Sequence, residues 1–452
     1  MTASNLNFVA LLFLFVAGII ILKSTKENAT KALLATAIFV PLGQQFVVLG
    51  LHLYFSRILI LLGFVRVMLH SELVGFHWNT IDKFFVSWAV VEFLMPNVRG
   101  LSFDVLIGSL GTAYNSFGIY FLLRFFIKDF IQVVGQLKFL CLASVILAIF
   151  VIPELVSGKN PFSFLGGVPP LSEIREGRIR CQGPFRHSIL LGTFAATLLP
   201  LMVGLWFQSG RDKGRALAGA LACAFVVYAS GSSGPLLSVL LAALGLTMWP
   251  IRHRMGLVRK VTVVGLIGLA FMMKAPIWYI IDRISGVAGG SGWHRSYLID
   301  QAVQHFNEWW LLGTSVTAHW APFGMVLEVD PNNMDITNHY IAQGIGGGIV
   351  GLMLFIGIIV YCFKLIGFSV NFAEQFSLVE RKLIWTAGVS LTAHCAAFIS
   401  VAYFDQIQVF WFWLLAIVSC ITSVPFQSSG FDLFSNDGEE TNFKSGEVAP
   451  VS

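Results

Sequence analysis

The feature that most constrains this chain is a series of apolar runs, each about 20 residues long, that recurs along almost the whole sequence. Of its 452 residues, 56% are hydrophobic and only 12% are charged, which excludes a soluble domain of this length. Because a bilayer offers the backbone no hydrogen-bond partners, the runs predict helices, whereas a β-barrel would show short alternating segments. We expect an all-α integral membrane protein with about 12–13 transmembrane helices. The runs lie near residues 7–22, 32–52, 55–70, 81–96, 103–123, 131–152, 188–208, 215–231, 233–250, 260–281, 338–366, 383–402 and 404–424.

Basic residues gather in alternate loops between these runs, and this pattern predicts the orientation of the chain. Lys and Arg in short loops remain on the cytoplasmic side. The N-terminus is then outside, and the polar, acidic residues 425–452 form a disordered cytoplasmic tail. Residues 1–424 form a single polytopic membrane domain with two larger external loops, 153–187 and 282–338. The residues that set this orientation are Lys23, Lys26, Lys31, Arg124, Lys128, Arg211, Lys213, Arg215, Arg252, Arg254, Arg259, Lys260, Arg381 and Lys382.

The first external loop contains an arginine cluster in the segment EIREGRIRCQGPFRHS, residues 173–188. Such a cluster on the external side runs against the cytoplasmic bias of basic residues. A guanidinium grips phosphate or carboxylate at two points, so the cluster suits a lipid-linked pyrophosphate beside the membrane. Alternatively, these arginines pair with acids of the other external loop. The cluster consists of Arg175, Arg178, Arg180 and Arg186.

The second external loop contains glycines followed by a helix-compatible run, GGSGWHRSYLIDQAVQHFNEWWLLGTS, residues 289–315. Apolar residues recur at helical spacing from Leu298 to Trp309 or Trp310. We expect an amphipathic helix at the membrane interface, with the tryptophans at headgroup level. Near its start, Arg295 either points into a cavity or touches lipid headgroups. The loop is predicted to pack against the arginine-rich loop, either as a lid over a site or in a purely structural role, because it holds the acids Asp282, Asp300, Glu308, Glu328, Asp330 and Asp335.

Neither the histidines nor the cysteines show the spacing of metal ligands. The histidines of the second loop lack the paired spacing of a zinc-protease helix. The cysteines fit neither a disulfide framework nor a redox site. We therefore predict no metal and no cofactor. The residues concerned are His294, His305, His319 and His339, and Cys141, Cys181, Cys223, Cys362, Cys395 and Cys420.

The segment DITNHYIAQG, residues 335–344, places polar groups at the start of a membrane helix, where they are costly without partners. His339, Gln343, Gly347 and Gly351 are four residues apart and share one helix face. The glycines permit close approach of another helix or of a substrate chain. Asp335, Thr337 or Asn338 is the expected N-cap, and such a helix end favours anions. The imidazole of His339 either accepts a proton or is satisfied by a loop carbonyl.

Three segments are similar to the O-antigen ligase and O-antigen polymerase superfamily of bacterial polytopic membrane glycosyltransferases. RCQGPFRHSILLGTF (180–194) is similar to its pattern before a membrane helix. The run that starts at Gly292 and TNHYIAQGIGGGIVGLMLFIG (337–357) resemble two further family segments, although Asn338 precedes His339 in reverse of the usual order. Many relatives have an arginine in a short turn where this chain has ASGSSGP (229–235), so Arg180 or Arg186 would supply that charge.

The resemblance implies transfer of a glycan from an undecaprenyl pyrophosphate carrier to an acceptor sugar at the periplasmic face of the bacterial inner membrane. The acceptor would be lipid A core for a ligase, as in lipopolysaccharide, or a second lipid-linked repeat for a polymerase, as in exopolysaccharide biosynthesis. Membrane lipids are further partners, and nucleic acid is not. His339 and Arg295 would be catalytic, with Arg295 also holding the pyrophosphate together with Arg180, Arg186 and Arg178. The supporting residues are Asn338, Gln343, His187 and His294.

Two other classes of function remain open from the residues. A transporter or flippase of polar lipid or glycan predicts ionisable groups deep within several spans, and here Glu92, Asp104 and Lys274 lie near span ends or alone. A non-catalytic membrane scaffold predicts that replacement of His339 and Arg295 leaves the phenotype intact.

Overall fold

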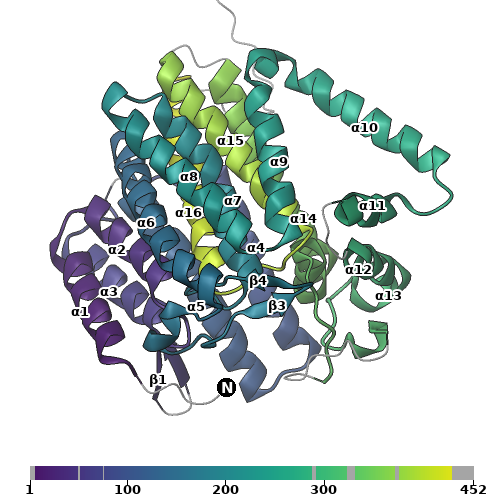
Figure 1. The fold of residues 1–452 in the computed structure, drawn as a ribbon, viewed down its shortest axis with the longest axis horizontal. Helices are drawn as coiled ribbons and strands as arrows, with labels where there is room; N and C mark the ends of the chain where they lie inside the picture. Colours follow the sequence, from purple (N-terminus) through teal and green to yellow (C-terminus); the bar gives the residue numbers. More distant parts are fainter. Residues whose placement is uncertain are drawn as a thin grey trace, which may run out of the picture.

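A computed structural model describes residues 6–48, 51–74, 76–287, 292–322, 331–371 and 376–429. Its helices form a bundle (Figure 1). In the described residues, the paired strands form two short hairpins. The predicted class of all-α membrane protein is confirmed, because five described helices are long and apolar enough to cross a membrane. They are Phe103–Phe126, Phe130–Ser157, Ser188–Trp206, Trp249–Met272 and His339–Asn371.

Each predicted apolar run overlaps one long helix of the structure. These helices are α1 (Phe8–Lys23), α2 (Lys26–Phe39), α3 (Phe55–Leu69), α4 (Thr80–Arg99), α5 (Phe103–Phe126), α6 (Phe130–Ser157), α7 (Ser188–Trp206), α8 (Lys213–Ala229), α9 (Ser233–Thr247), α10 (Met255–Met272), α14 (His339–Asn371), α15 (Leu378–Phe398) and α16 (Gln406–Ser429). Shorter elements are α11 (Ile280–Val287), α12 (Gly292–Gln304), α13 (Phe306–Trp309), η1 (Pro161–Leu165) and η5 (Ala318–Trp320). The two hairpins pair β1 (Gln45–Val48) with β2 (Leu51–Tyr54), and β3 (Glu173–Arg175) with β4 (Arg178–Arg180).

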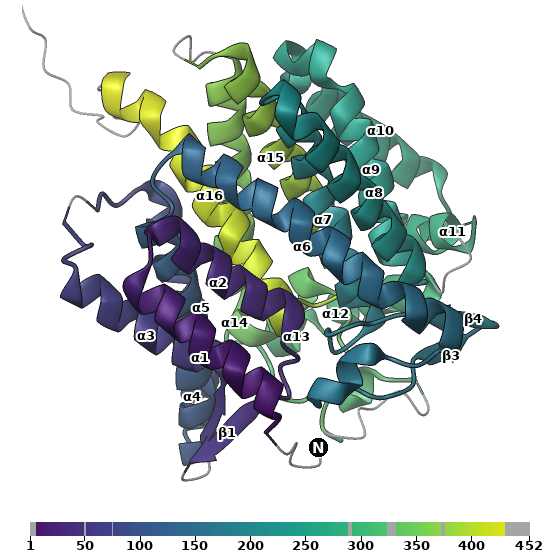
Figure 2. The ribbon, with the colours of Figure 1, turned by 60° about the vertical axis from the view of Figure 1, so that its left-hand side comes forward.

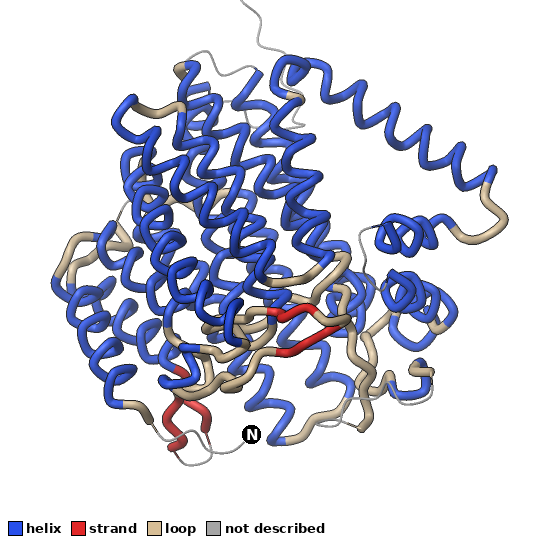
Figure 3. The backbone as a smooth tube through the Cα atoms, viewed as in Figure 1, coloured by secondary structure: helices blue, strands red, loops and turns tan. Residues whose placement is uncertain are grey.

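The apolar run 32–52 is interrupted near Pro41, as the proline in the sequence indicates. The helix α2 ends at Phe39, just before Pro41, whose ring fixes φ and which has no N–H for a helical hydrogen bond. The chain then turns into the antiparallel pair β1 and β2, in which Gln45 is opposite Tyr54. The tube in Figure 3 shows this hairpin in red, beside the start of the chain.

The helix α7 is the centre of the bundle and packs against α6, α8, α9 and α15 (Figure 2). It is apolar on all sides and buried around almost its whole circumference, as expected for an internal helix. The hydroxyl of Thr197 is satisfied by the carbonyl oxygens of Thr193 and Phe194 in the preceding turn. Because α7 is central, its first residues lie at a point where several other elements meet.

The basic connections between helices meet at one end of the bundle. The Arg66 side chain donates to the carbonyl oxygen of Ser24 (2.6 Å), and Gln208 donates to that of Val379 (3.4 Å). The rings of Phe130 and Phe376 are in contact there, with centroids 5.8 Å apart. The η1 turn, both hairpins, α12 and α13 lie at the opposite end (Figure 1). These connections and the hairpins therefore lie at opposite ends of the bundle.

The turn between β3 and β4 explains why the arginine-rich segment folds as a hairpin. Glu176 and Gly177 both have positive φ, at 53° and 75°. Two residues with positive φ form the type I′ turn that suits the twist of a two-residue hairpin. Arg175 and Arg178 are paired directly across the strands, so the turn brings these two arginines side by side.

The predicted amphipathic helix is two short helices, because the chain bends at His305 between α12 and α13. Leu298, Ala302 and Trp309 of the predicted apolar face are buried in a small cluster with residues of α14. Trp309 therefore faces protein rather than lipid headgroups, and its ring lies against Gly344. Trp310 is 43% exposed. Of the predicted acids of this loop, Glu328 and Asp330 lie outside the described residues.

The helix α14 is broken at Gly348, which has φ 65° and ψ −167°. Backbone groups released by the break find partners in the chain after α13. The Ile349 N–H donates to the carbonyl oxygen of Trp310 (2.8 Å), and the Thr314 N–H donates to that of Ile345 (3.0 Å). Non-helical backbone inside a membrane protein is tolerated where protein supplies such partners. At the C-terminal end, α16 extends to Ser429, and residues 430–452 of the predicted tail lie outside the described residues.

Candidate functional site

A cavity of about 1660 Å³ opens at the hairpin end of the bundle. The β3–β4 hairpin, the first turns of α7 and α9, the start of α12 and the connection between α15 and α16 form its walls. Together with the segment directly before α14, these walls bring polar and charged groups together from six separate parts of the chain. The polar and charged residues of its lining are Glu173, Arg175, Glu176, Arg178, Arg180, His187, Ser188, Ser232, Ser233, His294, Arg295, Asp335, Thr337 and Ser400.

Two arginines meet at the N-terminal end of α9. Arg180 Nη2 donates to Ser232 Oγ (2.9 Å), and Arg295 Nη2 donates to Ser233 Oγ (3.3 Å). Ser232 is the N-cap position of α9, and its side chain caps no backbone N–H there. A helix N-terminus attracts anions through its open N–H groups and its dipole, and guanidinium groups add full charges. This corner of the cavity has the composition of a phosphate-binding site.

Local packing holds Arg180 in this position. Its stem passes Gly231, which has φ 55° and where a Cβ would come within 3.1 Å of Arg180 Cγ. Glu173, across the hairpin, pairs with Arg180 Nη1 at 2.7 Å. The Nε atom of Arg180 is buried without a hydrogen-bond partner among the described residues.

The structure brings five of the predicted site residues to this cavity: Arg178, Arg180, Arg295, His187 and His294. Arg180, rather than Arg186, lies on the 229–235 turn. Arg186 does not line the cavity as described, and Nη1 of this residue pairs with Asp405 Oδ2 at 3.8 Å. The alternative that the arginines pair with acids of the second loop does not hold for Arg180 and Arg186. Their ionic partners are Glu173 and Asp405, which lie in other segments.

His339 lies in the packed interior and does not line the cavity as described. The Tyr403 N–H donates to His339 Nδ1 (3.1 Å), and Gln343 Nε2 lies 3.4 Å from His339 Nε2. Phe355, Phe398 and Tyr403 surround the imidazole, with ring centroids 4.9 to 5.3 Å away. The helix face expected to open toward a substrate is therefore covered by aromatic side chains in this conformation.

Asn338 and Gln343, two of the predicted supporting residues, have structural partners. Asn338 Oδ1 accepts from the Ile341 N–H (3.2 Å), so Asn338 is the N-cap of α14 among the three candidates. Gln343 Oε1 accepts from the indole N–H of Trp88 (2.6 Å). These contacts explain how polar groups at this depth are satisfied.

His187 and His294 are the two imidazoles of the cavity. Desolvation, and then the Arg186 guanidinium, lower the pKa of His187, while Asp335 opposes the shift. Desolvation also lowers the pKa of His294. The Asp335 carboxylate raises this pKa, and the Arg295 guanidinium lowers it. Both rings are therefore neutral near pH 7 and can take up a proton. Thr337 Oγ1 lies 3.3 Å from His294 Nδ1, which orients that ring.

Several cavity residues escaped the sequence prediction, chiefly Ser232, Ser233, Trp293 and the role of Asp335. The serines belong to a small polar run directly before an apolar helix, which is a typical N-cap signal. That signal could have placed a helix N-terminus here. The contact of this helix end with the arginines could not be predicted from a local pattern. Arg180 is 52 positions from Ser232, and Arg295 is 62 positions from Ser233.

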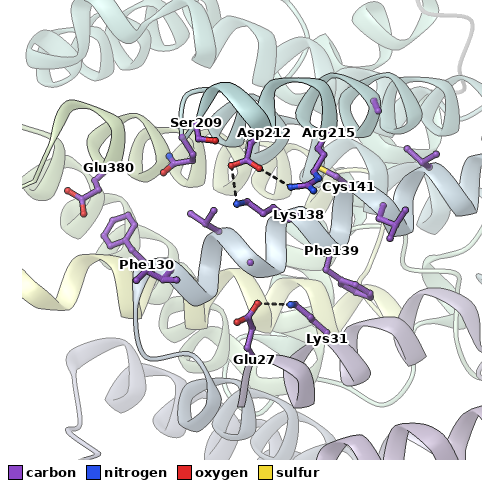
Figure 4. A pocket seen from close by; sticks show the side chains of 17 residues that line it. Glu27, Lys31, Phe130, Lys138, Phe139, Cys141, Ser209, Asp212, Arg215 and Glu380 are labelled. Carbon is purple, nitrogen blue, oxygen red and sulfur yellow. Dashed lines mark hydrogen bonds and ion pairs between the residues drawn. The ribbon is translucent and has the colours of Figure 1, made fainter. Parts of the chain in front are cut away.

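A second cavity of about 1050 Å³ lies between α2, α6 and the start of α8 (Figure 4). Its charges compensate one another within the cavity. Lys31 pairs with Glu27 (2.6 Å), and Asp212 holds both Lys138 (3.0 Å) and Arg215 (3.2 Å). The hairpin-end cavity combines two arginines with a helix N-terminus and is the better candidate for an anionic ligand.

No model of a known protein family matches the sequence, and no curated protein matches it. The case for a function therefore depends on the residues and geometry of the cavity.

Proposed function

We propose that the chain transfers a glycan from a polyprenyl pyrophosphate carrier to a hydroxyl group of an acceptor sugar. The observation that carries this proposal is the convergence of Arg180 and Arg295 on the N-terminal end of α9. Paired guanidinium groups and a helix N-terminus suit the two charges and four non-bridging oxygens of a glycan-linked pyrophosphate better than they suit a single carboxylate. The family resemblance of the sequence points to the same reaction.

The proposed setting is the bacterial inner membrane, with the cavity on the periplasmic face. All thirteen long helices are taken to contribute to the membrane domain, although some are shorter than a full span. The basic connections gather at one end and mark the cytoplasmic side. The arginine-rich cavity lies at the other end, where a lipid-linked donor would present its headgroup while its polyprenyl tail stays in the bilayer.

The reaction needs no metal or nucleotide, because the carrier already contains a good leaving group. The oxygen of the acceptor hydroxyl forms a bond to the anomeric carbon of the donor glycan, while the bond from that carbon to the pyrophosphate oxygen breaks. The electron pair of the broken bond leaves with the polyprenyl pyrophosphate. Arg180 and Arg295 bind the oxygens on which this charge develops, which stabilises the transition state.

The proton of the acceptor hydroxyl is assigned to His294. This imidazole lines the cavity next to Arg295, and it is oriented through Nδ1 by Thr337. The ring is neutral near pH 7 and its Nε2 is then the proton acceptor. His339 is assigned a positioning role, because Nδ1 is bound to the backbone of Tyr403 and its ring is enclosed. The acceptor is lipid A core in a ligase and a second lipid-linked repeat in a polymerase.

Transport of a polar lipid is the second candidate, and one observation favours it. Glu92 of α4 lies partly buried beside the broken part of α14, and a Cβ on Gly347 would come within 2.8 Å of its Oε1. This oxygen has no hydrogen-bond partner among the described residues. A broken helix beside an intramembrane acid is a feature of transporters. Under this alternative, Glu92→Gln abolishes glycolipid movement across proteoliposomes.

The decisive experiment uses the purified full chain in lipid nanodiscs with an undecaprenyl-pyrophosphate-linked oligosaccharide and an acceptor. Release of undecaprenyl pyrophosphate and extension of the acceptor are measured together. Arg295→Ala is expected to lower turnover by about 10²–10³-fold, and His294→Ala by about 10²–10⁴-fold. Arg215→Ala, in the second cavity, is the matched control and retains activity.

Several outcomes would contradict the proposal. Wild-type turnover in both Arg295→Ala and His294→Ala excludes transfer in this cavity. Loss of turnover in His339→Ala, with normal folding and with His294→Ala unaffected, would return the proton-accepting role to His339. Absence of turnover in the wild-type chain, with movement of the glycolipid across the bilayer, would favour transport.

A further inference from the structure

Three ligand-type side chains lie together in the second external segment, away from the arginine-lined cavity. His305 precedes α13, Glu308 belongs to α13, and His319 belongs to η5. His305 Nδ1 is 2.8 Å from Glu308 Oε1, and His319 Nε2 is 2.8 Å from Glu308 Oε2. One ligand atom from each residue lies within 4.8 Å of the other two. The spacing in sequence predicted no metal site, because the fold alone brings His319 to the other two.

Trp320 holds this cluster in place. Its ring is fully buried and stacks on the His305 imidazole, with centroids 5.3 Å apart and planes 15° from parallel. Its indole N–H donates to Glu308 Oε2 at 3.0 Å. The Tyr297 hydroxyl in turn donates to the carbonyl oxygen of Trp320 (2.7 Å). Partners that orient metal ligands in this way are typical of metal sites, where they fix both ring orientation and carboxylate position.

We propose that His305, Glu308 and His319 bind one divalent transition-metal ion, with zinc as the best match. Two imidazole nitrogens and one carboxylate oxygen form a common zinc ligand set, and a fourth position remains for water. The cation would take the place of the hydrogen bonds between each imidazole and the carboxylate, through ring nitrogens that carry no proton. The ligands are partly exposed, which leaves an entry path for the ion.

The ion would join α13 to η5 and thereby close the intervening chain, residues 310–317, into a fixed loop. That loop supplies the backbone partners of the break in α14, through Trp310 and Thr314. The metal is therefore structural in this proposal and holds the external segment against α14. It is independent of glycan transfer, and its test does not depend on any enzymatic activity.

The test uses the full chain in detergent, purified through a tag without histidine and stripped with a chelator. Titration with Co²⁺ is followed by its visible absorption, which reports four-coordinate binding, and Zn²⁺ competition gives the zinc affinity. One ion per chain is expected. Glu308→Gln and His319→Ala are each expected to weaken binding by at least ~10- to 100-fold. His52→Ala is the matched control, because this histidine lies on the β1–β2 hairpin and bonds to Gln45.

Folding of each variant is verified by its elution as a monodisperse species and by its thermal unfolding in chelator. The proposal is overturned by either of two results. One is a wild-type chain that is folded but binds no Co²⁺ at one equivalent. The other is binding that Glu308→Gln and His319→Ala leave unchanged, since the ion would then lie elsewhere and the three residues would form only a hydrogen-bonded cluster.

Discussion

At the scale of single residues, the structure places predicted arginines in one cavity and His339 in the packed interior. The external arginines predicted an anion site, and Arg178, Arg180 and Arg295 indeed line one cavity. The polar side chain of His339 instead has partners in the packed interior. The difference is physical. A charged side chain is costly to bury unless water or an anion contacts it. A neutral imidazole can be buried once one of its nitrogens forms a hydrogen bond.

Arg180 should bind pyrophosphate through its fork rather than through charge alone. Arg180→Lys keeps the charge but loses the planar pair of donors that reaches Ser232 and Glu173. We expect about tenfold weaker binding of inorganic pyrophosphate, which corresponds to one lost charge-assisted hydrogen bond. Isothermal titration of the full chain measures the change, and Arg215→Lys serves as the control. Equal affinities of Arg180→Lys and the wild type would show that the fork makes no difference.

Anion binding in the cavity should strengthen as pH falls. The pKa values of His187 and His294 are below the usual value, so both rings are neutral in the free protein near pH 7. A bound pyrophosphate favours the protonated rings and raises both pKa values, so binding takes up protons. Affinity should increase from pH 7 to about pH 5, by about tenfold for each unit of pKa change. The affinity of the wild type is divided by that of the double variant His187→Ala/His294→Ala, so that the titration of pyrophosphate itself cancels. A ratio that does not change with pH would contradict this linkage.

At the scale of elements, helix existence was predictable and helix interruptions were not. Apolar length identified each long helix, because any such run must satisfy its own backbone in lipid. The break in α14 depends on Trp310 and Thr314, which approach from another segment. The bend at His305 likewise depends on how α12 and α13 cover α14. Only Pro41, whose effect is local, gave a visible sign of an interruption.

Position 348 should require glycine because of its backbone conformation, and not only because a larger side chain would not fit. An alanine at φ 65° is strained, and its Cβ would meet the backbone of Leu311. We expect Gly348→Ala to lower the free energy of unfolding by about 1–3 kcal/mol. Gly367→Ala is the matched control, since that glycine is helical and nothing lies near its Cβ position. Thermal unfolding of both variants in the same detergent compares them, and equal midpoints would contradict the assignment.

At the scale of the whole molecule, the order of helices followed from the sequence, but their depth in the bundle did not. The spans that contain α7 and α10 have similar mean hydropathies of 2.0 and 1.7, yet 83% of one and 0% of the other is buried in protein. Lipid and protein interior are equally apolar, so hydropathy cannot distinguish a central helix from a peripheral one. Small residues are the available clue, as at Gly192 and Gly204 of α7, where other side chains approach closely.

The orientation of the whole bundle can be tested through one exposed position at each end. Glu176 is in the hairpin turn beside the cavity, and Arg211 is in a basic connection at the other end. We expect Glu176→Cys in intact spheroplasts to react with a membrane-impermeant maleimide and Arg211→Cys to react only after permeabilisation. The native cysteines give a low background, since five are buried and Cys395 is partly buried. Labelling of Arg211→Cys from outside would invert the orientation, place the arginine-lined cavity in the cytoplasm and remove a periplasmic donor from consideration.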